Sequence, residues 1–401
     1  MKTNIVSNIE KERCAGCFAC YNVCLVNAIN MNFSNEGFYT PYVNEALCTD
    51  CGRCLDVCPV EKTPSLEDRF LEPKTYVAWS LDDSIRLNSS SGGIYPEIAR
   101  KVLEEKGVVF AVGWNNEWLP EHKEIVNWEQ ISETQGSKYV QSNVNLTYSR
   151  IVNYLKQGKK VLFVGTPCQV AGLRNTTKIF KIEEFESNAI LVDLVCHGVP
   201  SPKAFRKYLY ENFDLSNIIS INFRNKQIGW SKFQLKVTKK HGNEYKSLPY
   251  KNSFFYGFLI NVYLARLCYN CPFSKVPRQG DITLGDFWGV PDKYKDEKGV
   301  SVVLVNSKKG EEIFFELIKD KKIFAEQVFL ETASKSNPRI ISGEMKIPNE
   351  REQFFKDLDS KSWRYLTRKY IKPPVGLRSF IRRGFRFAKR VFKKIIKIIT
   401  R

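Results

Sequence analysis

The sequence predicts a multidomain protein of the α+β or α/β class, in which a small cysteine-rich module precedes a larger domain of mixed strands and helices. The chain has 401 residues, which is more than a single hydrophobic core usually spans. Eight of its 12 cysteines fall in the first 62 residues, a stretch that is poor in long periodic segments. After residue 74, strand-like apolar runs alternate with helical ones, which indicates a largely parallel sheet.

The larger domain is predicted from runs that follow one another in a regular order. Strand-like runs occupy residues 75–80, 108–114, 161–165 and 189–195, and helical segments occupy residues 94–105 and about 146–157. From about Ser220 the runs become more alternating and aromatic, which suggests an antiparallel portion or a second lobe.

Composition is typical of a folded globular protein, because hydrophobic residues make up 43% of the chain and aromatic residues 13%. No window approaches the ~18 consecutive apolar residues of a membrane span, and the first residues lack the apolar stretch of a signal peptide. We therefore expect the protein in the cytoplasm. In that reducing compartment, 12 cysteines indicate metal ligation or catalysis rather than disulfides.

Eight cysteines form two copies of the motif C-x2-C-x2-C-x3-C. In this motif three cysteines hold one 4Fe-4S cubane, and the fourth reaches across to the other cluster. The first cluster would take Cys14, Cys17, Cys20 and Cys58, and the second would take Cys48, Cys51, Cys54 and Cys24. Gly16 and Gly52 fall inside the loops, where backbone amides must turn toward sulfur. The spacing predicts a bacterial two-cluster ferredoxin module.

Structural zinc is the alternative for these eight cysteines. Zinc sites pair C-x2-C knuckles that lie well apart, and a third cysteine three residues further on, found twice here, is not their pattern. One departure from the ferredoxin pattern is Leu25, which stands where a proline usually follows the fourth cysteine. This change should affect packing more than ligation.

The four remaining cysteines are enough for one further cluster. Cys168 follows one predicted strand and Cys196 ends another, so both are expected at the carboxyl ends of strands, where open α/β sheets bind ligands. Cys268 and Cys271 form a C-x2-C pair that could complete the site. Zinc is the second choice here, and burial as inert small hydrophobic side chains is the structural alternative.

Six segments, taken in order, carry a resemblance to a known family. They are SSSGG (89–93), GSKYVQS (136–142), GKKVLFVGTPCQVAGL (158–173), DLVCHGVPSP (193–202), FRNKQIGW (223–230) and the stretch from CYNCPF to DITLGDFWG (268–289). Over about residues 75–290 the chain resembles the family of coenzyme F-420 hydrogenase and dehydrogenase beta subunits, with a dicluster module fused before it. The resemblance implies flavin adenine dinucleotide (FAD) beside a 4Fe-4S cluster, so that the flavin exchanges a hydride with a substrate and single electrons with the cluster.

The same segments supply residues that would bind the flavin. The SSSGG segment opens a predicted helix, and hydroxyls and free amides at a helix N-terminus could bind a flavin phosphate, although a plain serine N-cap is equally compatible. Residues 136–142 suit the isoalloxazine or a carbonyl substrate, or form a solvated loop. The expected set is Ser90, Ser91, Gly92, Gly93, Ser137, Lys138, Tyr139, Gln141, Ser142, Thr166, Asp286 and Trp288.

Three side chains are candidates for catalysis: His197, Lys138 and Asp286. Asp286 lies in GDFWG, which could stack on a ring or form a packed turn. His197, beside Cys196, could donate to a cluster thiolate or carry a proton, and a structural histidine is the alternative. There is no Walker loop, no G-x-G-x-x-G after a strand and no nucleophile elbow, which excludes those enzyme classes.

The predicted organisation has six parts. They are a dicluster ferredoxin domain (1–62), a linker (63–74), a flavin-binding α/β part (75–220), a part with the C-x2-C pair and GDFWG (221–345), a helical connector (346–371) and a basic amphipathic tail (372–401). In full, the expected fold is a small ferredoxin-like dicluster domain followed by a larger mixed α/β flavin and iron-sulfur domain.

The net charge of +19 is concentrated in the tail, where eleven Lys or Arg and no acid occur between Lys372 and Arg401. Apolar residues recur there at steps of three and four, which predicts a basic amphipathic helix of the kind that lies in an anionic membrane interface. The protein could then be peripheral at the inner face of the membrane. A partner-docking helix or a solvated tail is the alternative, and nucleic acid is not expected because no nucleic-acid module is recognised.

The sequence thus predicts an iron-sulfur flavoprotein oxidoreductase. Electrons would pass between the ferredoxin clusters and the flavin through the third cluster, and the flavin would reduce or oxidise a small two-electron substrate, a deazaflavin or an unsaturated compound. The rival hypothesis is a non-enzymatic electron-transfer relay that serves a partner oxidoreductase as one of its subunits. Both roles require a redox partner protein or another electron donor.

Overall fold

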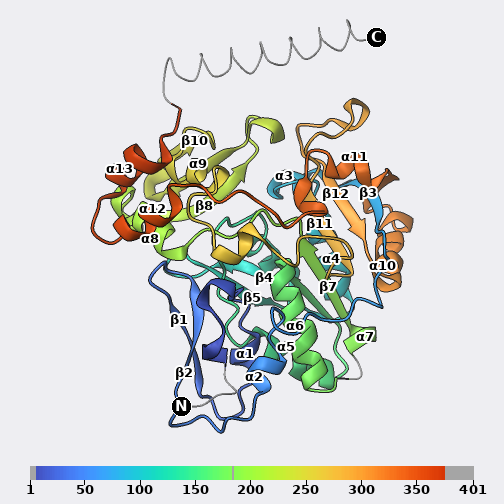
Figure 1. Cartoon of the computed structure of the whole chain (residues 1–401). Coiled ribbons are helices and arrows are strands. Elements are labelled where there is room, and N and C mark those ends of the chain that lie inside the picture. Colours follow the sequence, from blue (N-terminus) through green and yellow to red (C-terminus); the bar gives the residue numbers. More distant parts are fainter. Residues whose placement is uncertain (1–5, 183–184, 375–401) are drawn as a thin grey trace, which may run out of the picture.

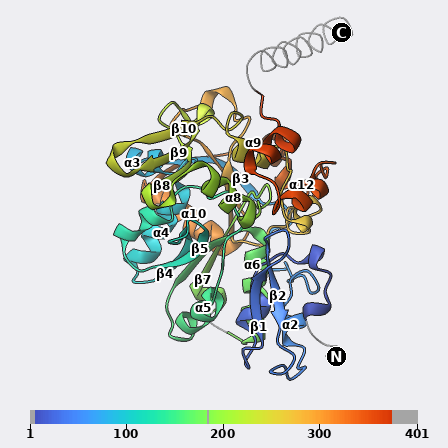
Figure 2. The same cartoon turned by 90° about the vertical axis from the view of Figure 1, so that its left-hand side faces the viewer.

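The computed structural model describes residues 6–182 and 185–374, whose arrangement is shown in Figure 1. The predicted amphipathic tail, residues 372–401, lies almost entirely outside the described residues. In the described part, a small N-terminal module (blue) lies against one side of a larger body, and Figure 2 shows the same contact from the side. The body contains an eight-stranded main sheet and a lobe with a three-stranded sheet.

The elements that are named below have the following bounds. The strands are β1 (Ile29–Phe33), β2 (Tyr39–Val43), β3 (Lys74–Ser80), β4 (Val108–Trp114), β5 (Pro120–Ile125), β6 (Val161–Gly165), β7 (Ala189–Leu194), β8 (Ile218–Asn225), β9 (Gln234–Lys239), β10 (Glu244–Ser247), β11 (Ile282–Asp286), β12 (Ser301–Val305) and β13 (Ile323–Gln327). The helices are α1 (Ala19–Asn22), α2 (Arg53–Asp56), α3 (Asp83–Asn88), α4 (Ile94–Glu104), α5 (Thr147–Lys156), α6 (Pro167–Ile179), α7 (Phe185–Asn188), α8 (Pro202–Asn212), α9 (Ser253–Leu259), α10 (Lys308–Lys319), α11 (Leu330–Ser334), α12 (Arg351–Asp357) and α13 (Trp363–Leu366).

The main sheet has the strand order β13-β3-β12-β11-β7-β6-β4-β5. Its central strands β11, β7, β6 and β4 are parallel, as the alternating pattern predicts, and the outer pairs are antiparallel. The four predicted strands and two predicted helices before residue 200 are all present. One difference is β3, which pairs with none of the other predicted strands but lies between β12 and β13, two strands from much later in the chain, and runs antiparallel to both. The predicted class, a small module followed by a mixed α/β domain, is confirmed.

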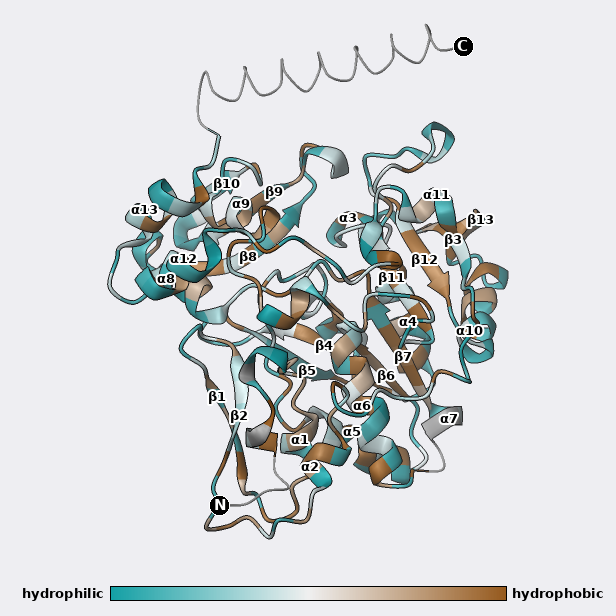
Figure 3. Cartoon of the chain, viewed as in Figure 1, coloured by the Kyte–Doolittle hydropathy of each residue, from teal (hydrophilic) through white to brown (hydrophobic). Residues whose placement is uncertain are grey.

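Helices cover both faces of the main sheet, and one of the two cores continues into the module. Helices α4 and α10 bury Ile98 and Phe314 against one face. Helices α5 and α6 bury Leu155 and Leu173 against the other face, in a core that also contains Phe18 of the module. Figure 3 shows this pattern as apolar (brown) central strands beneath amphipathic helices. The module is therefore joined to the body by shared apolar burial, which is the main favourable contribution to such packing.

The module consists of an antiparallel hairpin, β1–β2, and the short helices α1 and α2. The residues directly before these helices, Phe18 and Gly52, have φ values of 66° and 75°, which turn the chain sharply at the cysteine loops. A left-handed conformation is routine for glycine, whereas for Phe18 it carries a steric cost. Phe18 is buried in the shared core, so its packing offsets that cost.

The turn of the β1–β2 hairpin docks onto the body. Arg351 of α12 donates to both carboxylate oxygens of Glu36, at 2.8 and 2.6 Å, and its side chain is 1% exposed. Ser201 donates to the Glu36 carbonyl at 2.6 Å, and Lys203 donates to the Asn35 carbonyl at 2.9 Å. A bidentate arginine–carboxylate pair fixes orientation as well as distance, so the hairpin turn holds the module at a defined angle.

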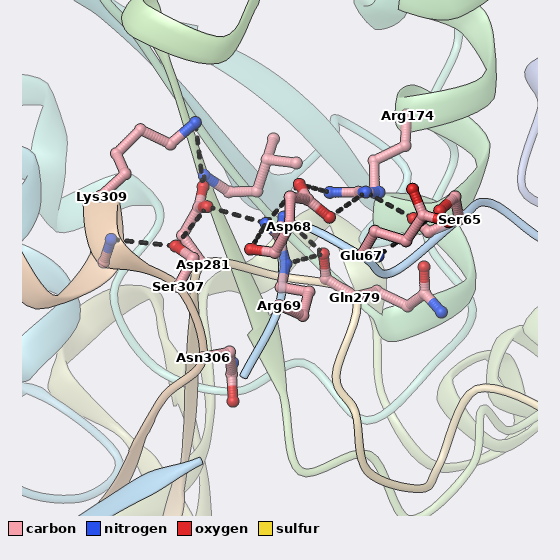
Figure 4. A network of polar contacts seen from close by, with 12 residues as sticks. Ser65, Glu67, Asp68, Arg69, Arg174, Gln279, Asp281, Asn306, Ser307 and Lys309 are labelled. Carbon is pink, nitrogen blue, oxygen red and sulfur yellow. Dashed lines mark hydrogen bonds and ion pairs between the residues drawn. The ribbon is translucent and has the colours of Figure 1, made fainter. Parts of the chain in front are cut away.

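Residues 63–74, expected as a linker, form a strap that is bound to the body. Arg174 of α6 donates to both carboxylate oxygens of Asp68, at 3.0 and 2.8 Å. Arg69 is buried, donates to the Gln279 carbonyl, and lies 3.4 Å from the Asp281 carboxylate. Figure 4 shows these side chains joined in one network that reaches the start of α10. The strap is therefore a second point at which the module is tied to the body.

The lobe combines the antiparallel sheet β10-β9-β8 with α8, α9, α12 and α13 around an aromatic core. Its core residues include Phe205, Phe223, Phe254 and Trp363. An antiparallel portion after Ser220 is present as predicted, but β11, β12 and β13 then return to the main sheet. The predicted helical connector, 346–371, lies within the lobe and contains α12, α13 and a π-helical turn at Thr367–Ile371.

Candidate functional site

The first thiol group consists of Cys14, Cys17, Cys20 and Cys58, the four predicted ligands of the first cluster. Burial and then the neighbouring Cys58 and Cys20 raise the pKa of Cys17 well above its ordinary value. Burial also raises the pKa of Cys14 to about 11, although the Gly16 N–H donates to its sulfur. The thiols lie close enough for their charges to interact, as shared ligation requires. Iron would displace the protons, because the thiolate is the form that binds metal.

The second thiol group consists of Cys24, Cys48, Cys51 and Cys54, the predicted ligands of the second cluster. Burial raises the pKa of Cys54, and Cys48 lies near enough to add to this effect. Backbone N–H groups donate to two of the sulfurs, from Ala28 to Cys24 at 3.2 Å and from Asp50 to Cys48 at 3.4 Å. Cys51 is exposed, whereas Cys17 and Cys20 of the first thiol group are buried. The second thiol group therefore lies at the surface of the module.

The third thiol group consists of Cys168, Cys196, Cys268 and Cys271, which lie at the carboxyl ends of β6 and β7. Cys168 occupies the first turn of α6, and Cys196 follows β7. Burial, followed by Cys271 and Cys196, raises the pKa of Cys168. Burial, followed by the same Cys196 and Cys271, raises the pKa of Cys268 to about 12. The structure thus brings together the four cysteines that the sequence leaves over, and their ligation of a cluster stays a prediction.

Residues 338–345 form a clasp around the third thiol group. Arg339 donates to the backbone carbonyls of Cys196, Cys268 and Gly343, at 3.1, 3.3 and 2.5 Å. The Gly343 carbonyl in turn accepts from the Cys271 N–H at 3.0 Å, and a Cβ on Gly343 would lie 1.9 Å from the Cys271 carbonyl oxygen. The charge of Arg339 lowers the pKa of Cys196 and Cys268, against burial, which raises both. Nothing in the local sequence around Arg339 points to this role.

Helix α6 connects the first and third thiol groups. Cys168 lies in its first turn, and Gly172 follows one turn later. A Cβ on Gly172 would lie 3.1 Å from the Cys17 sulfur, so no side chain separates the helix from that thiol. Cys17 is also close enough to raise the pKa of Cys168, after the larger contributions of burial and of the other third-group cysteines. The two thiol groups are therefore neighbours across one turn of helix.

The donor atoms of each thiol group fit a 4Fe-4S cluster. Across residues 6–182 and 185–374, no three His, Cys, Asp or Glu side chains are arranged to hold a single metal ion. A cubane carries its four thiolates on four separate irons and holds them further apart than one ion does. Four sulfur donors without a nitrogen or oxygen ligand are the set that such clusters use.

A cavity of about 830 Å³ opens at the carboxyl ends of the parallel strands. Thr166, Cys196 and Asp286, from the ends of β6, β7 and β11, line it together with the first residues of α4. Its volume lies in the range of cofactor and ligand sites, and this end of a parallel sheet is where such sites occur. Aromatic side chains form much of the remaining wall: Tyr139, Phe233, Tyr250, Phe255, Phe258 and Trp288. The cavity therefore reaches the third thiol group at Cys196.

Most of the residues expected to bind flavin line this cavity, namely Ser90, Ser91, Gly93, Ser137, Lys138, Tyr139, Ser142, Thr166, Asp286 and Trp288. The serine hydroxyls are already engaged: that of Ser90 accepts from the Ser137 N–H at 2.7 Å, and that of Ser91 donates to the Val300 carbonyl at 2.6 Å. An anionic group bound here would meet the backbone N–H groups at the start of α4, which lack partners within the helix.

Gly92 and Gln141, also expected to bind flavin, do not line the cavity. The Gly92 N–H donates to Ser301, and a Cβ at Gly92 would lie 2.5 Å from the Ala78 carbonyl oxygen. Gln141 accepts from the Tyr39 N–H at 2.9 Å, and a Cβ at Gly16 would lie 2.2 Å from its amide nitrogen. Gln141 therefore joins the body to the loop that carries Cys14 and Cys17.

Arg224 organises one wall of the cavity. Its guanidinium donates to both carboxylate oxygens of Asp286, at 2.5 and 2.8 Å, and also to the Tyr139 hydroxyl at 3.0 Å and the Ser90 carbonyl at 3.2 Å. Burial opposes its charge, but Asp286 and Tyr139 outweigh burial and raise the pKa of Arg224. The segment FRNKQIGW contains Arg224, and this was the available signal for it.

Asp286 is held on two sides, because it also accepts from the Trp230 indole at 2.8 Å. The aromatic rings of Trp230 and Trp288 stack with centroids 5.0 Å apart, and the Arg224 guanidinium lies 3.9 Å from the Phe233 ring centroid. Asp286 thus anchors a stack of cation and aromatic groups. This engagement fits a positioning role for Asp286 better than the proton transfer expected of a catalytic group.

Lys138 and His197 are the other catalytic candidates, and both line the cavity. Lys138 donates to the carbonyls of Gln135 and Gly136, at 3.0 and 3.1 Å, and burial followed by the nearby Lys123 lowers its pKa to about 7. The His197 ring lies 2.6 Å from the Asn261 side-chain oxygen, and burial lowers the pKa of His197. Lys138 can therefore hold or release a proton near neutral pH.

Among the helices of the described ranges, none has both the length and the apolar character needed to span a bilayer.

Comparisons with known families agree with this architecture. The 4Fe-4S dicluster domain model matches residues 13–62. The models for the N-terminal and C-terminal parts of the beta subunit of coenzyme F420 hydrogenase/dehydrogenase match residues 75–147 and 158–329.

Two relatives and one solved structure are similar to the chain. One of the subunits of the F(420)H(2) dehydrogenase of Methanosarcina mazei is 23% identical over 332 residues, which cover 80% of this chain and 86% of that protein. Coenzyme F420-dependent sulfite reductase of Methanocaldococcus jannaschii is 26% identical over 316 residues, which cover 76% of this chain and 46% of that protein. A chain of the F420-reducing [NiFe] hydrogenase complex of Methanosarcina barkeri aligns with a TM-score of 0.50 and 20% identity, over 70% of this chain and 93% of that one, and shows a shared fold.

Proposed function

We propose that the chain is an iron-sulfur flavoprotein oxidoreductase. The premise is that it belongs to the family of coenzyme F420 hydrogenase/dehydrogenase beta subunits and carries a 4Fe-4S dicluster domain before the family region. Electrons pass between the dicluster domain and a third cluster, held by Cys168, Cys196, Cys268 and Cys271, and from there to FAD in the cavity. The substrate is a small two-electron compound, a deazaflavin or an unsaturated molecule.

One observation carries this proposal: the thiol groups follow one another as neighbours, and the third group borders the cavity. The exposed Cys51 marks one end, and Cys17 packs against α6 near Cys168. Cys196 lies both in the third thiol group and in the cavity wall. The order of the groups is thus surface, interior, sheet edge and cavity, which is the order that electron passage to a bound cofactor requires.

When bound, a flavin supplies the conversion between one-electron and two-electron transfer. The residues of this chain would hold and orient it. The N-terminus of α4 offers backbone N–H groups to its phosphates, and Tyr139, Phe233 and Trp288 offer aromatic faces to its rings. Arg224 fixes the Tyr139 hydroxyl, and Lys138 holds a proton at the cavity wall.

A relay role is the second candidate, because the similar protein of Methanosarcina mazei is named as a subunit of a dehydrogenase. The two candidates differ in what the isolated protein does. With reduced methyl viologen as the donor and an unsaturated or deazaflavin acceptor, an enzyme turns over by itself. A relay protein accepts electrons from the donor only until its cofactors are reduced, and it reacts further only when its partner protein is added.

Metal analysis tests the third cluster. After anaerobic reconstitution we expect about twelve iron and about twelve sulfide per chain, from four of each per cubane. Cys168→Ser and Cys271→Ser should each lower both values to about eight and leave the electron paramagnetic resonance (EPR) signals of the dicluster domain in place. The released flavin should have the mass of FAD. A wild-type protein that stops at about eight iron, or that holds no flavin, would contradict the proposal.

The pH profile of turnover tests Lys138. Since its pKa is lowered to about 7, its ammonium is present below that pH and is lost above it. If Lys138 supplies the proton for substrate reduction, the rate should fall as the pH rises through about 7, and Lys138→Met should remove this step. Lys226 is the matched control, because burial also lowers its pKa to about 7 while its ammonium is bonded to three backbone carbonyls. If the fall in rate near pH 7 persists in Lys138→Met and is lost in Lys226→Met, Lys138 is not the group that supplies the proton.

Vesicle binding tests the proposed location at an anionic membrane. The tail beyond Lys372 is expected to bind anionic vesicles, since each basic residue near such a surface contributes at most ~1 kcal/mol and apolar side chains add to it. Binding should weaken as salt rises, because charges are screened over ~10 Å at 0.1 M ionic strength. Truncation after Lys372 should abolish binding and leave the iron content unchanged. If the truncated protein still sediments with the vesicles, the tail is not what binds the membrane.

A further inference from the structure

The module has an inner side and an outer side. On the inner side, Cys17 is buried against Gly172, and the hairpin turn at Glu36 is bound by Arg351. On the outer side, the second thiol group includes the exposed Cys51. A protein that exchanges electrons with the module must therefore approach from the side of the second thiol group.

Large aliphatic side chains are exposed on that outer side, next to the cysteines. Leu25 directly follows Cys24 and is 68% exposed, and Leu47 directly precedes Cys48 and is 53% exposed. Val26 is 42% exposed. Single exposed aliphatic residues are common and carry no meaning. Here, however, they flank ligands of one predicted cluster.

These side chains come from two segments that lie side by side. In the β1–β2 hairpin, Ile29 is paired with Val43, and the Asn44 N–H donates to the Ala28 carbonyl at 2.7 Å. Residues 24–28 and 44–48 therefore continue the open end of the hairpin as neighbours. The outer patch, defined as Leu25, Val26, Leu47 and Cys51, is an apolar surface next to the second thiol group.

The stretch of sequence that carries the outer patch lacks the basic residues that dominate the chain as a whole. From Cys14 to Gly52 there is no Lys or Arg, although the chain has a net charge of +19. The acids of this stretch are Glu36, Glu45 and Asp50, and Glu36 is bound by Arg351. The exposed Glu45 therefore places an acid on the rim of the outer patch, whereas Arg53, the next basic residue, lies over the Phe180 ring at 5.5 Å. An anionic membrane would be repelled, whereas a basic protein surface would be attracted.

We propose that the outer patch is the docking surface for a small one-electron carrier protein that presents an apolar contact with a basic rim. Docking brings the carrier to the second thiol group, so that one electron could cross between the carrier and the 4Fe-4S cluster that this group would hold. One partner is oxidised by one electron and the other is reduced by one, and no bond forms and no proton moves. Such redox encounters are weak and use small interfaces, below about 1,200 Å², which is compatible with a patch of three aliphatic side chains.

The test uses the reconstituted holo-protein, reduced, and ferric cytochrome c as a basic one-electron acceptor in stopped-flow mixing. Leu25→Ser and Leu47→Ser should each lower the second-order rate constant about tenfold, equivalent to about 1.4 kcal/mol. Glu45→Lys should lower it as well, and rising salt should slow the wild type. Phe329→Ser and Glu331→Lys are the matched controls, since both residues are exposed at the start of α11, which lies away from the module in Figure 1, and they should leave the rate unchanged.

The rate at which oxidised benzyl viologen, a small molecule, oxidises the reduced protein should be the same in all variants, because this reaction needs no docking surface. The proposal is overturned if the leucine and Glu45 variants react with cytochrome c as fast as the controls do. It is also overturned if sedimentation shows a dimer that Leu25→Ser converts to monomers, because the outer patch would then be a contact between copies. This test depends only on the dicluster domain, so it remains decisive even if the third cluster or the flavin of the proposed function proves absent.

Discussion

An Asp286→Ala variant is expected to lose about 3–5 kcal/mol of unfolding free energy, because it leaves Arg224 as a buried charge without its partner. The Arg224 side chain is 1% exposed, and Asp286 accepts both of its charged hydrogen bonds as well as the Trp230 indole. The loss should lower the urea concentration at the unfolding midpoint of the holo-protein. The unfolding is done under anaerobic conditions and is monitored by tryptophan fluorescence. The Tyr139 hydroxyl, which Arg224 holds, should become less ordered, so flavin should also be bound more weakly.

Asp83→Ala is the control for this change. Asp83 pairs with Lys298 at 2.6 Å, but both side chains are about half exposed, so solvent screens the pair. Its unfolding midpoint should match that of the wild type. If Asp286→Ala unfolds at the same midpoint as Asp83→Ala, the pair of Arg224 and Asp286 does not stabilise the cavity wall.

A Gly172→Leu variant is expected to separate the dicluster domain electronically from the third thiol group. A Cβ added at Gly172 would lie 3.1 Å from the Cys17 sulfur, so a larger side chain must push the cysteine loop away from α6. Overpacking of this kind costs about 1–3 kcal/mol, which the shared core can tolerate. Magnetic interaction between paramagnetic centres weakens with distance, so the interaction between the first cluster and the cluster proposed at the third thiol group should weaken in the EPR spectrum of the fully reduced protein while iron content is kept.

Two variants control for general strain. Gly172→Ala adds one methyl group at the same place and should retain most of the interaction. Gly310→Ala strains a different helix, since a Cβ there would lie 2.2 Å from the Asp281 carbonyl oxygen, and Gly310 contacts no cysteine. If Gly310→Ala also weakens the magnetic interaction, the effect reflects loosened folding rather than the contact between Gly172 and Cys17.

Local patterns in the sequence predicted the features that depend on local spacing. The two cysteine motifs predict tight loops, and the structure places Cys14, Cys20 and Cys58 near Cys17, while their ligation of one cluster stays a prediction. Apolar runs such as residues 161–165 and 189–195 are buried on both faces in a parallel sheet, so their periodicity alone identifies them. Because the carboxyl ends of parallel strands meet at one edge, Cys168 and Cys196 could be expected to approach each other.

The features that depend on contacts between distant segments could not be predicted. Arg339 and Arg351 are buried arginines whose partners lie far away in the chain. A single arginine has no periodicity and no fixed spacing to its partner, so its burial appears only once the segments are packed. The same limit applies to Gln141, which lies in a segment with cavity residues but turns toward the module instead.

The two attachments of the module, at the hairpin turn through Glu36 and at the strap through Asp68, have a consequence for timing. A domain tied at one point can swing, and its electron transfer then waits for a productive encounter. A domain tied at two separated points by bidentate arginine pairs can rotate only about the line through those points, and the core that the module shares with the body around Phe18 opposes that rotation. The distance between the first and third thiol groups is thus fixed by folding and does not change afterwards. Passage between them should be insensitive to solvent viscosity, and the slow step of a complete cycle should lie at the surface or in the cavity, where molecules arrive and leave.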